Sequence, residues 1–175
     1  MKRIIVDEKN ETYSSFAGVL YNKDKTELLA CPCACNENVH IVDGVTVIGY
    51  EAFEECSRVL SISMPNSVKK IGKSAFSGCN KLKTINLSNN LQKLGIGAFS
   101  NCTALTDITI PGSLKTINVR TFEDCSNLEH VEFETGLECI WNFAFAGCKK
   151  IEKITLPSSV TEIGSSAFCA CSELT

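Results

Sequence analysis

The sequence predicts a β-rich solenoid, in which short repeats stack and their strands form a parallel ladder. The repeat period is 23 residues. One row of phenylalanines keeps this period, at Phe53, Phe76, Phe99, Phe122, Phe145 and Phe168. A row of cysteines keeps it too, at Cys56, Cys79, Cys102, Cys125, Cys148 and Cys171. A fixed period of about 20–50 residues is typical of proteins that stack one structural unit on the next.

The composition is that of one ordinary domain, with 175 residues of which 44% are hydrophobic. The formal net charge is −3, from 17 basic and 20 acidic residues along the chain. We see no basic stripe, so we expect no nucleic-acid partner. The start, MKRIIVDEKN, has too few consecutive apolar residues for a signal-peptide core, and no run is long enough to cross a membrane. We therefore expect no membrane insertion.

Residues 1–35 lie outside the regular repeat, and we interpret them as an N-terminal cap. Residues 4–6 are a candidate first strand. Apolar runs at 19–21 and 28–30 flank a polar turn at 22–26, which predicts a β-hairpin. Atypical terminal units are expected in solenoids, because they must cover an otherwise open core.

Three alternating cysteines, Cys31, Cys33 and Cys35, follow the hairpin. In an extended segment their thiols would point to one side, which suggests a soft-metal or redox site. A zinc site needs four ligands, and no second cysteine pair lies nearby. We favour a cysteine-rich loop without a metal, and we expect no cofactor.

Residues 36–175 contain about six repeats, the last of them truncated. Each opens with a strand in which alternate apolar residues bury one face, as in Leu105-x-x-Ile108-x-Ile110. Pro65, Pro111 and Pro157 end their strands, since proline has no N–H to donate. A second short apolar segment follows, and then a glycine such as Gly72 or Gly95, for which we expect a tight turn with positive φ. We expect six strands in one ladder, about 30 Å across.

An Ala-Phe-x-x-Cys step then closes the repeat, and we place its Phe and Cys inside the stack. Cysteine packs there as a small hydrophobe. The total of eleven cysteines is odd, which argues against a disulfide framework. We predict free thiols along the ladder, because parallel Cβ directions disfavour disulfide geometry. Many free thiols suit a reducing cytosol or an anaerobic habitat.

The full pattern is L-x-x-I-x-L-P-x-x-V-x-x-I-G-x-x-A-F-x-x-C, with Leu, Ile and Val exchanging at the apolar positions. It resembles the BspA-like leucine-rich repeats, and the resemblance covers residues 13–175. The resemblance implies a leucine-rich repeat solenoid, a right-handed α/β superhelix with irregular or helical turns on its convex side. It also implies a surface protein of host-associated bacteria or mucosal protozoa, used for adhesion or protein binding.

Recognition should use outward strand positions, whose side chains are not needed for packing. These candidate ligand-binding residues are Ser61, Ser63, Thr84, Asn86, Asp107, Thr109, His130, Glu132, Lys153 and Thr155. The strip suits hydrogen bonding to a protein or glycan. The alternative is an ordinary solvated strand face, because polar residues alternate outward in any half-buried sheet.

Trp141 and Phe143 break the repeat and form a candidate aromatic patch. Trp141 replaces the turn glycine, and Phe143 stands where other repeats have small or polar residues. Exposed aromatics often anchor partners. The alternative is packing against an adjacent loop.

The sequence offers little for catalysis, and we expect no enzyme. His40 and His130 are four repeats apart, so they cannot form one site. His130 with Glu132 and Asp107 is the best acid–base grouping, but it is solvent-exposed.

Two functions stay open. The first is an extracellular or cell-surface adhesion module, and the second is an intracellular protein-interaction scaffold, which the thiols and the missing signal peptide favour. Leu174 begins a further strand, so we expect either a longer native chain or end-to-end self-association through an open C-terminal repeat.

Overall fold

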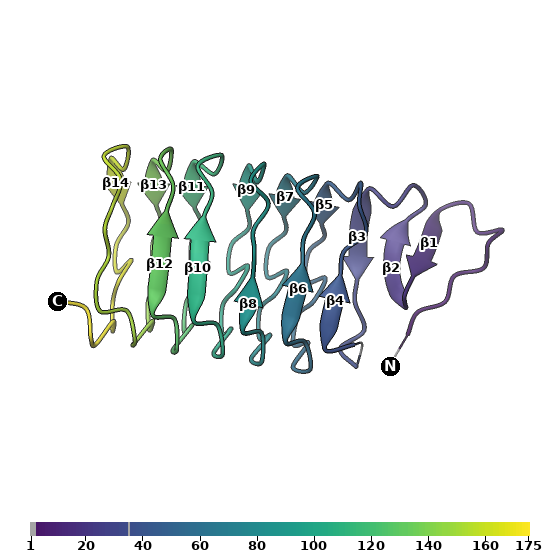
Figure 1. Cartoon of the computed structure of the whole chain (residues 1–175), viewed down its shortest axis with the longest axis horizontal. Coiled ribbons are helices and arrows are strands. Elements are labelled where there is room, and N and C mark those ends of the chain that lie inside the picture. The colour runs from purple at the N-terminus through teal and green to yellow at the C-terminus, as the bar shows by residue number, and fades with distance from the viewer. Residues whose placement is uncertain (1–2, 35) are drawn as a thin grey trace.

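The computed structural model describes residues 3–34 and 36–175, which form one elongated stack with the chain ends at opposite ends (Figure 1). The strands are β1 (Tyr13–Phe16), β2 (Val19–Asn22), β3 (Glu27–Ala30), β4 (Asn38–His40), β5 (Val47–Ile48), β6 (Ser61–Ser63), β7 (Lys70–Ile71), β8 (Thr84–Ile85), β9 (Lys93–Leu94), β10 (Asp107–Ile110), β11 (Thr116–Ile117), β12 (His130–Phe133), β13 (Cys139–Ile140) and β14 (Glu162–Ile163). This confirms the parallel-strand solenoid.

The described residues contain no helix, so the turns between strands are irregular and the helical element of the predicted fold is wrong. It follows that no helix in this part of the chain could span a membrane.

A β-hairpin lies at the N-terminal end of the solenoid. β2 pairs antiparallel with β3, and β3 then pairs in parallel with β5, so the hairpin continues directly into the solenoid. The strand predicted at residues 4–6 is wrong, and β1 takes the outer position. Ile4 N donates to Gly18 O at 2.9 Å, but Val6 N donates to the side chain of Ser15 at 3.0 Å. A side-chain partner satisfies this N–H without extending the sheet.

Each coil of the solenoid contributes two short strands, except the last, which contributes only β14. The first ladder contains β4, β6, β8, β10 and β12, and the second contains β5, β7, β9, β11, β13 and β14, on opposite sides of the stack (Figure 1). The predicted inward residues Ile62, Ile85 and Ile108 of the first ladder are buried, whereas Val131 and Phe133 of β12 are half-buried. Residues 151–156 form no strand, so the expected sixth rung of the first ladder is absent.

The phenylalanine row lies in the interior and is continuous through the stack. Successive rings from Phe53 to Phe168 are stacked, with centroids 5.0, 5.0, 5.4, 5.2 and 5.5 Å apart. These separations are those of offset aromatic pairs, each of which adds about 0.5–1.5 kcal/mol beyond the burial of its area.

The cysteine row runs beside it and is hydrogen-bonded to it. From Cys79 onward the thiol of each ladder cysteine donates to the carbonyl of the phenylalanine in the preceding coil: Cys102 Sγ lies 3.2 Å from Phe76 O, and Cys148 Sγ lies 3.1 Å from Phe122 O. The thiol of Cys56 donates instead to Cys31 O at 3.5 Å. The same Phe76 oxygen also accepts the N–H of Cys79 at 3.1 Å. The predicted free thiols are confirmed for Cys102, Cys125, Cys148 and Cys171.

The glycines after the second strand have a different role from the one predicted. Gly72 and Gly95 do not have positive φ. A Cβ on Gly72 would lie 2.6 Å from Gly49 O, and a Cβ on Gly95 would lie 2.4 Å from the carbonyl carbon of Gly72. Glycine is therefore required because adjacent coils approach closely. Positive φ occurs two residues later, at Glu51, Ser74, Gly97, Arg120, Phe143 and Ser166.

Both ladders are interrupted between the coil of β8 and β9 and the coil of β10 and β11. We call residues 49, 72, 95, 118, 141 and 164 the glycine row. Elsewhere in the second ladder the backbone N–H of a row member donates to the preceding coil: Gly95 N bonds Ile71 O at 2.9 Å, and Gly164 N bonds Ile140 O at 2.7 Å. In the described chain no such bond joins Asn118 to Leu94.

Asn118 offers a physical reason for this gap. A Cβ on Gly95 would lie 2.4 Å from the carbonyl carbon of Gly72, so by its repeat position we expect the Cβ of Asn118 to crowd Gly95 at the normal spacing of the coils. Trp141 also carries a side chain in the glycine row, yet its N–H keeps the bond to Ile117 O at 2.9 Å. The bond is thus kept at Trp141, which follows Asn118 in the row, and is absent at Asn118, which follows Gly95.

We predict that Asn118→Gly closes the gap and raises the free energy of unfolding by about 1 kcal/mol. Restored backbone hydrogen bonds, each contributing about 0.5–1.5 kcal/mol, outweigh the roughly 0.5–1 kcal/mol entropic cost of a new glycine. Urea unfolding measures the difference. The control is Trp141→Gly, which restores no bond and should not stabilise. A destabilised Asn118→Gly variant would contradict the explanation.

We predict that the buried thiols make stability fall at alkaline pH. Burial raises the pKa of Cys102 and Cys125 well above the ordinary 9.0, and the charge of the neighbouring ladder thiol raises it further. Below pH 9 both states hold these protons and stability is unaffected. Above it only the unfolded chain ionises, so each thiol lowers the free energy of unfolding by about 1.4 kcal/mol per pH unit. The free energy of unfolding, measured by urea titration at each pH, should therefore fall less steeply with pH in Cys102→Ala than in the unchanged chain. Equal slopes for the two proteins above pH 9 would contradict this prediction.

Candidate functional site

The predicted outward residues lie on one exposed surface, which we call the strand face. It consists of the outward side chains of the first ladder and of residues 153 and 155. All ten candidates are exposed except Ser61, which is half-buried. Parallel pairing aligns them in two rows, in which Asp107 is level with His130, and Thr109 with Glu132. Lys153 and Thr155 continue these rows on a segment that is not a strand.

The ladder interruption divides the strand face into two chemically different halves. On the N-terminal half the candidates carry hydroxyl and amide groups, and Ser61 Oγ donates to Asn38 Oδ1 at 2.6 Å. On the C-terminal half Asp107, Glu132 and Lys153 bring charge, and Thr109 Oγ1 donates to Glu132 Oε2 at 3.4 Å. A single ligand would therefore meet neutral groups at one end and charged groups at the other.

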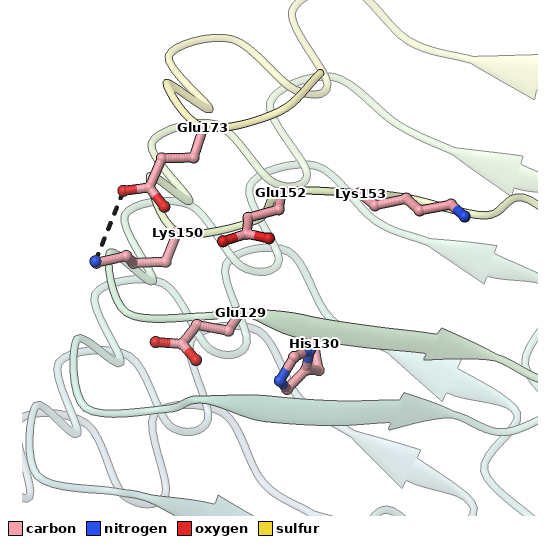
Figure 2. Close-up of a pocket in the computed structure, with 6 residues that line it drawn as sticks. All are labelled: Glu129, His130, Lys150, Glu152, Lys153 and Glu173. Atoms are coloured by element: carbon pink, nitrogen blue, oxygen red, sulfur yellow. Dashed lines mark ion pairs between the residues drawn. The ribbon is translucent and has the colours of Figure 1, made fainter.

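A hollow of about 370 Å³ lies at the charged end of the strand face. Its lining is Glu129, His130, Lys150, Glu152, Lys153 and Glu173. Figure 2 shows Glu129, Lys150, Glu152 and Glu173 gathered on one side, His130 beside them, and Lys153 extending away. Lys150 Nζ lies 3.6 Å from Glu173 Oε1, while both side chains stay near half-exposed. The hollow thus offers donors and acceptors of both charges to a ligand.

The sequence analysis missed four of these six residues. Glu129 and Glu152 occupy one repeat position and Lys150 and Glu173 another, in the turn before the first strand. Their 23-residue spacing could therefore have shown that these four side chains lie side by side. It was overlooked because only positions within the strands were considered.

The predicted aromatic patch is partly covered. Trp141 and Phe143 are both half-buried, and the guanidinium carbon of Arg120 lies 5.3 Å from the centre of the Phe143 ring. Such a cation–π contact uses the ring face that a ligand would need. This arrangement favours local packing, and a binding role for the pair stays a prediction.

The two described cysteines of the cluster differ in exposure. Cys31 is buried, whereas Cys33 is exposed and its thiol donates to Glu54 O at 3.3 Å. Cys35 lies outside the described residues. Within residues 3–34 and 36–175 there is no group of three His, Cys, Asp or Glu side chains that could hold a metal ion.

Charge is also less evenly distributed than the sequence analysis assumed. All seven charged residues between Glu55 and Asp107 are basic: Arg58, Lys69, Lys70, Lys73, Lys81, Lys83 and Lys93. The acidic excess therefore resides in the coils on either side of this block. The absence of any acidic residue over so long a stretch was the signal that was missed.

A protein-family model matches the same repeated segments of the chain. The model of the BspA type leucine rich repeat region matches residues 46–175 in six copies. The chain belongs to this leucine-rich repeat family. The match confirms the resemblance drawn from the repeat letters.

Solved structures of bacterial leucine-rich repeat proteins share the fold. One from Eubacterium ventriosum is 29% identical, with a TM-score of 0.77 over 98% of this chain and 53% of its own. One from Bacteroides ovatus is 27% identical, with a TM-score of 0.63 over 98% and 51%. The T. pallidum leucine rich repeat protein is 25% identical, with a TM-score of 0.66 over 97% and 90%. The chain spans about half the length of the first two, and no curated protein sequence matches it.

Proposed function

We propose that this chain is a non-catalytic binding module of a cell-surface or secreted adhesion protein, and that it binds host or extracellular ligands through the strand face. Leucine-rich repeat proteins are generally protein-interaction modules, and those of the BspA type are often surface-associated. The observation that carries the proposal is the strand face itself. Its outward side chains, apart from the half-buried Ser61, are exposed, and they lie outside the hydrophobic core of the coils.

The charged end of the strand face is the part best suited to select a ligand. His130 and Lys153 line the mixed-charge hollow, Glu132 lies two residues after His130 on the same strand, and all three are exposed. Charged groups on such a rim fix the register of a partner and exclude partners of the wrong charge pattern.

An intracellular scaffold is the alternative, and the thiol content was its main support. The buried ladder weakens that support. Cys102, Cys125 and Cys148 are completely buried, and each donates its S–H to a phenylalanine carbonyl. Thiols held in this way are shielded from oxidants, so they do not require a reducing compartment.

The test of the strand face uses the folded chain, fluorescently labelled, on cultured mucosal epithelial cells. We expect saturable binding that falls at least about fivefold when His130, Glu132 and Lys153 are replaced together by Ala, because a few central residues dominate most interfaces. The matched control replaces Lys115, Glu138 and Glu162, which are exposed in or directly before strands of the second ladder. Unchanged binding by the first triple, or an equal loss in the control, would exclude the strand face.

Location is tested separately, by protease treatment of intact source cells. Loss of the protein while a cytosolic marker survives supports surface display. Survival of the protein together with the marker would favour the intracellular scaffold.

A further inference from the structure

The second ladder carries an open groove where its strands part. The groove has a volume of about 540 Å³ and lies over β7, β9 and β11. Its floor includes Gly72 and Gly95, which have no side chains to fill it, and Asn118 stands at the far end. The strand face belongs to the first ladder, on the opposite side of the stack (Figure 1), so this groove is a separate surface.

Two large apolar side chains are exposed at this groove. Tyr50 is 69% exposed and Ile96 is 44% exposed, and they occupy the same repeat position two coils apart. Lys73 holds that position in the coil between them. Aromatic and aliphatic groups presented beside a hollow are typical anchors of a partner.

The rim of the groove is cationic. Lys70, Lys73 and Lys93 line it, and no carboxylate is among its described lining residues. Lys70 Nζ lies over the Tyr50 ring, 5.7 Å from its centre. The ion pairs in the described chain involve other residues, so these three ammonium groups are not neutralised by a neighbouring carboxylate. An apolar hollow with a positive rim is complementary to a ligand that is both apolar and anionic.

Backbone groups at the gap distinguish a peptide from other anionic ligands. Leu94 and Asn118 both line the groove, and in the described chain no backbone hydrogen bond joins β9 to β11. Edges without their ladder partners present carbonyl and N–H groups that the main chain of a peptide can match. A glycan would use the lysines but has no comparable set of amide groups.

We propose that this groove binds an acidic peptide segment that inserts an aromatic or aliphatic side chain between Tyr50 and Ile96. Its carboxylates pair with Lys70, Lys73 and Lys93, and its backbone bonds the groups left open between β9 and β11. The site does not depend on the strand face, so either surface could function if the other did not.

The test is a selection of short random peptides, displayed on phage, for binding to the folded chain. Enriched peptides should combine net negative charge with an apolar residue, and added salt should weaken them by screening the lysines. Synthetic copies of these peptides should bind Lys70→Gln/Lys93→Gln and Ile96→Ser about tenfold more weakly than the unchanged chain.

Matched controls separate groove binding from general charge or stickiness. Lys83→Gln removes a charge of the same basic block outside the groove, and Ile163→Ser replaces an isoleucine that is 49% exposed on β14. Both variants should bind the selected peptides as tightly as the unchanged chain does, and their unfolding midpoints should equal its midpoint. Enriched peptides without acidic residues, or an equal loss in the controls, would overturn the proposal. So would polygalacturonate or heparin binding at the groove when no acidic peptide is enriched.

Discussion

The stacked phenylalanines and the thiols bonded to them hold this solenoid together. Each ring stacks on the next, from Phe53 to Phe168, and each ladder thiol from Cys79 onward bonds a phenylalanine carbonyl of the coil before it. Beside them, Phe99 N donates to Thr121 O at 2.8 Å, across the same boundary where both strand ladders stop. The coils therefore stay joined along this side where their strands part.

This constraint explains where the chain is free to vary. A coil needs its Phe, its Cys and its buried aliphatic residues, because each packs against its equivalents in both neighbours. The strands are short by comparison, and two coils can lose their strand bonds without separating. Both candidate binding surfaces lie on the strand ladders: the strand face extends across the interruption, and the groove opens at it. The interior row of phenylalanines and cysteines holds the coils rigidly together, and the coils differ from one another mainly in their ladder strands.

The sequence predicted the periodic features because burial recurs at one phase, as at Phe99 and Cys102. It predicted the exposure of His130 and Glu132 from strand alternation. It did not predict the gap at Asn118, because the cost of a Cβ there depends on the distance to Gly95 in the preceding coil. The groove was missed for a related reason: Tyr50 and Lys93 meet through stacking, and each alone is an ordinary surface residue.

Native-state amide hydrogen exchange of the unchanged chain tests the central claim most directly, because it reports on each backbone bond. If the interior row joins the coils across the gap, the amides of Phe99 and Phe122 exchange only on global unfolding. The amides of Thr116 and Asn118 exchange much faster. Equal protection of all four would show that the ladders are continuous, and early loss of protection at Phe99 would show that the interior row does not hold the coils together.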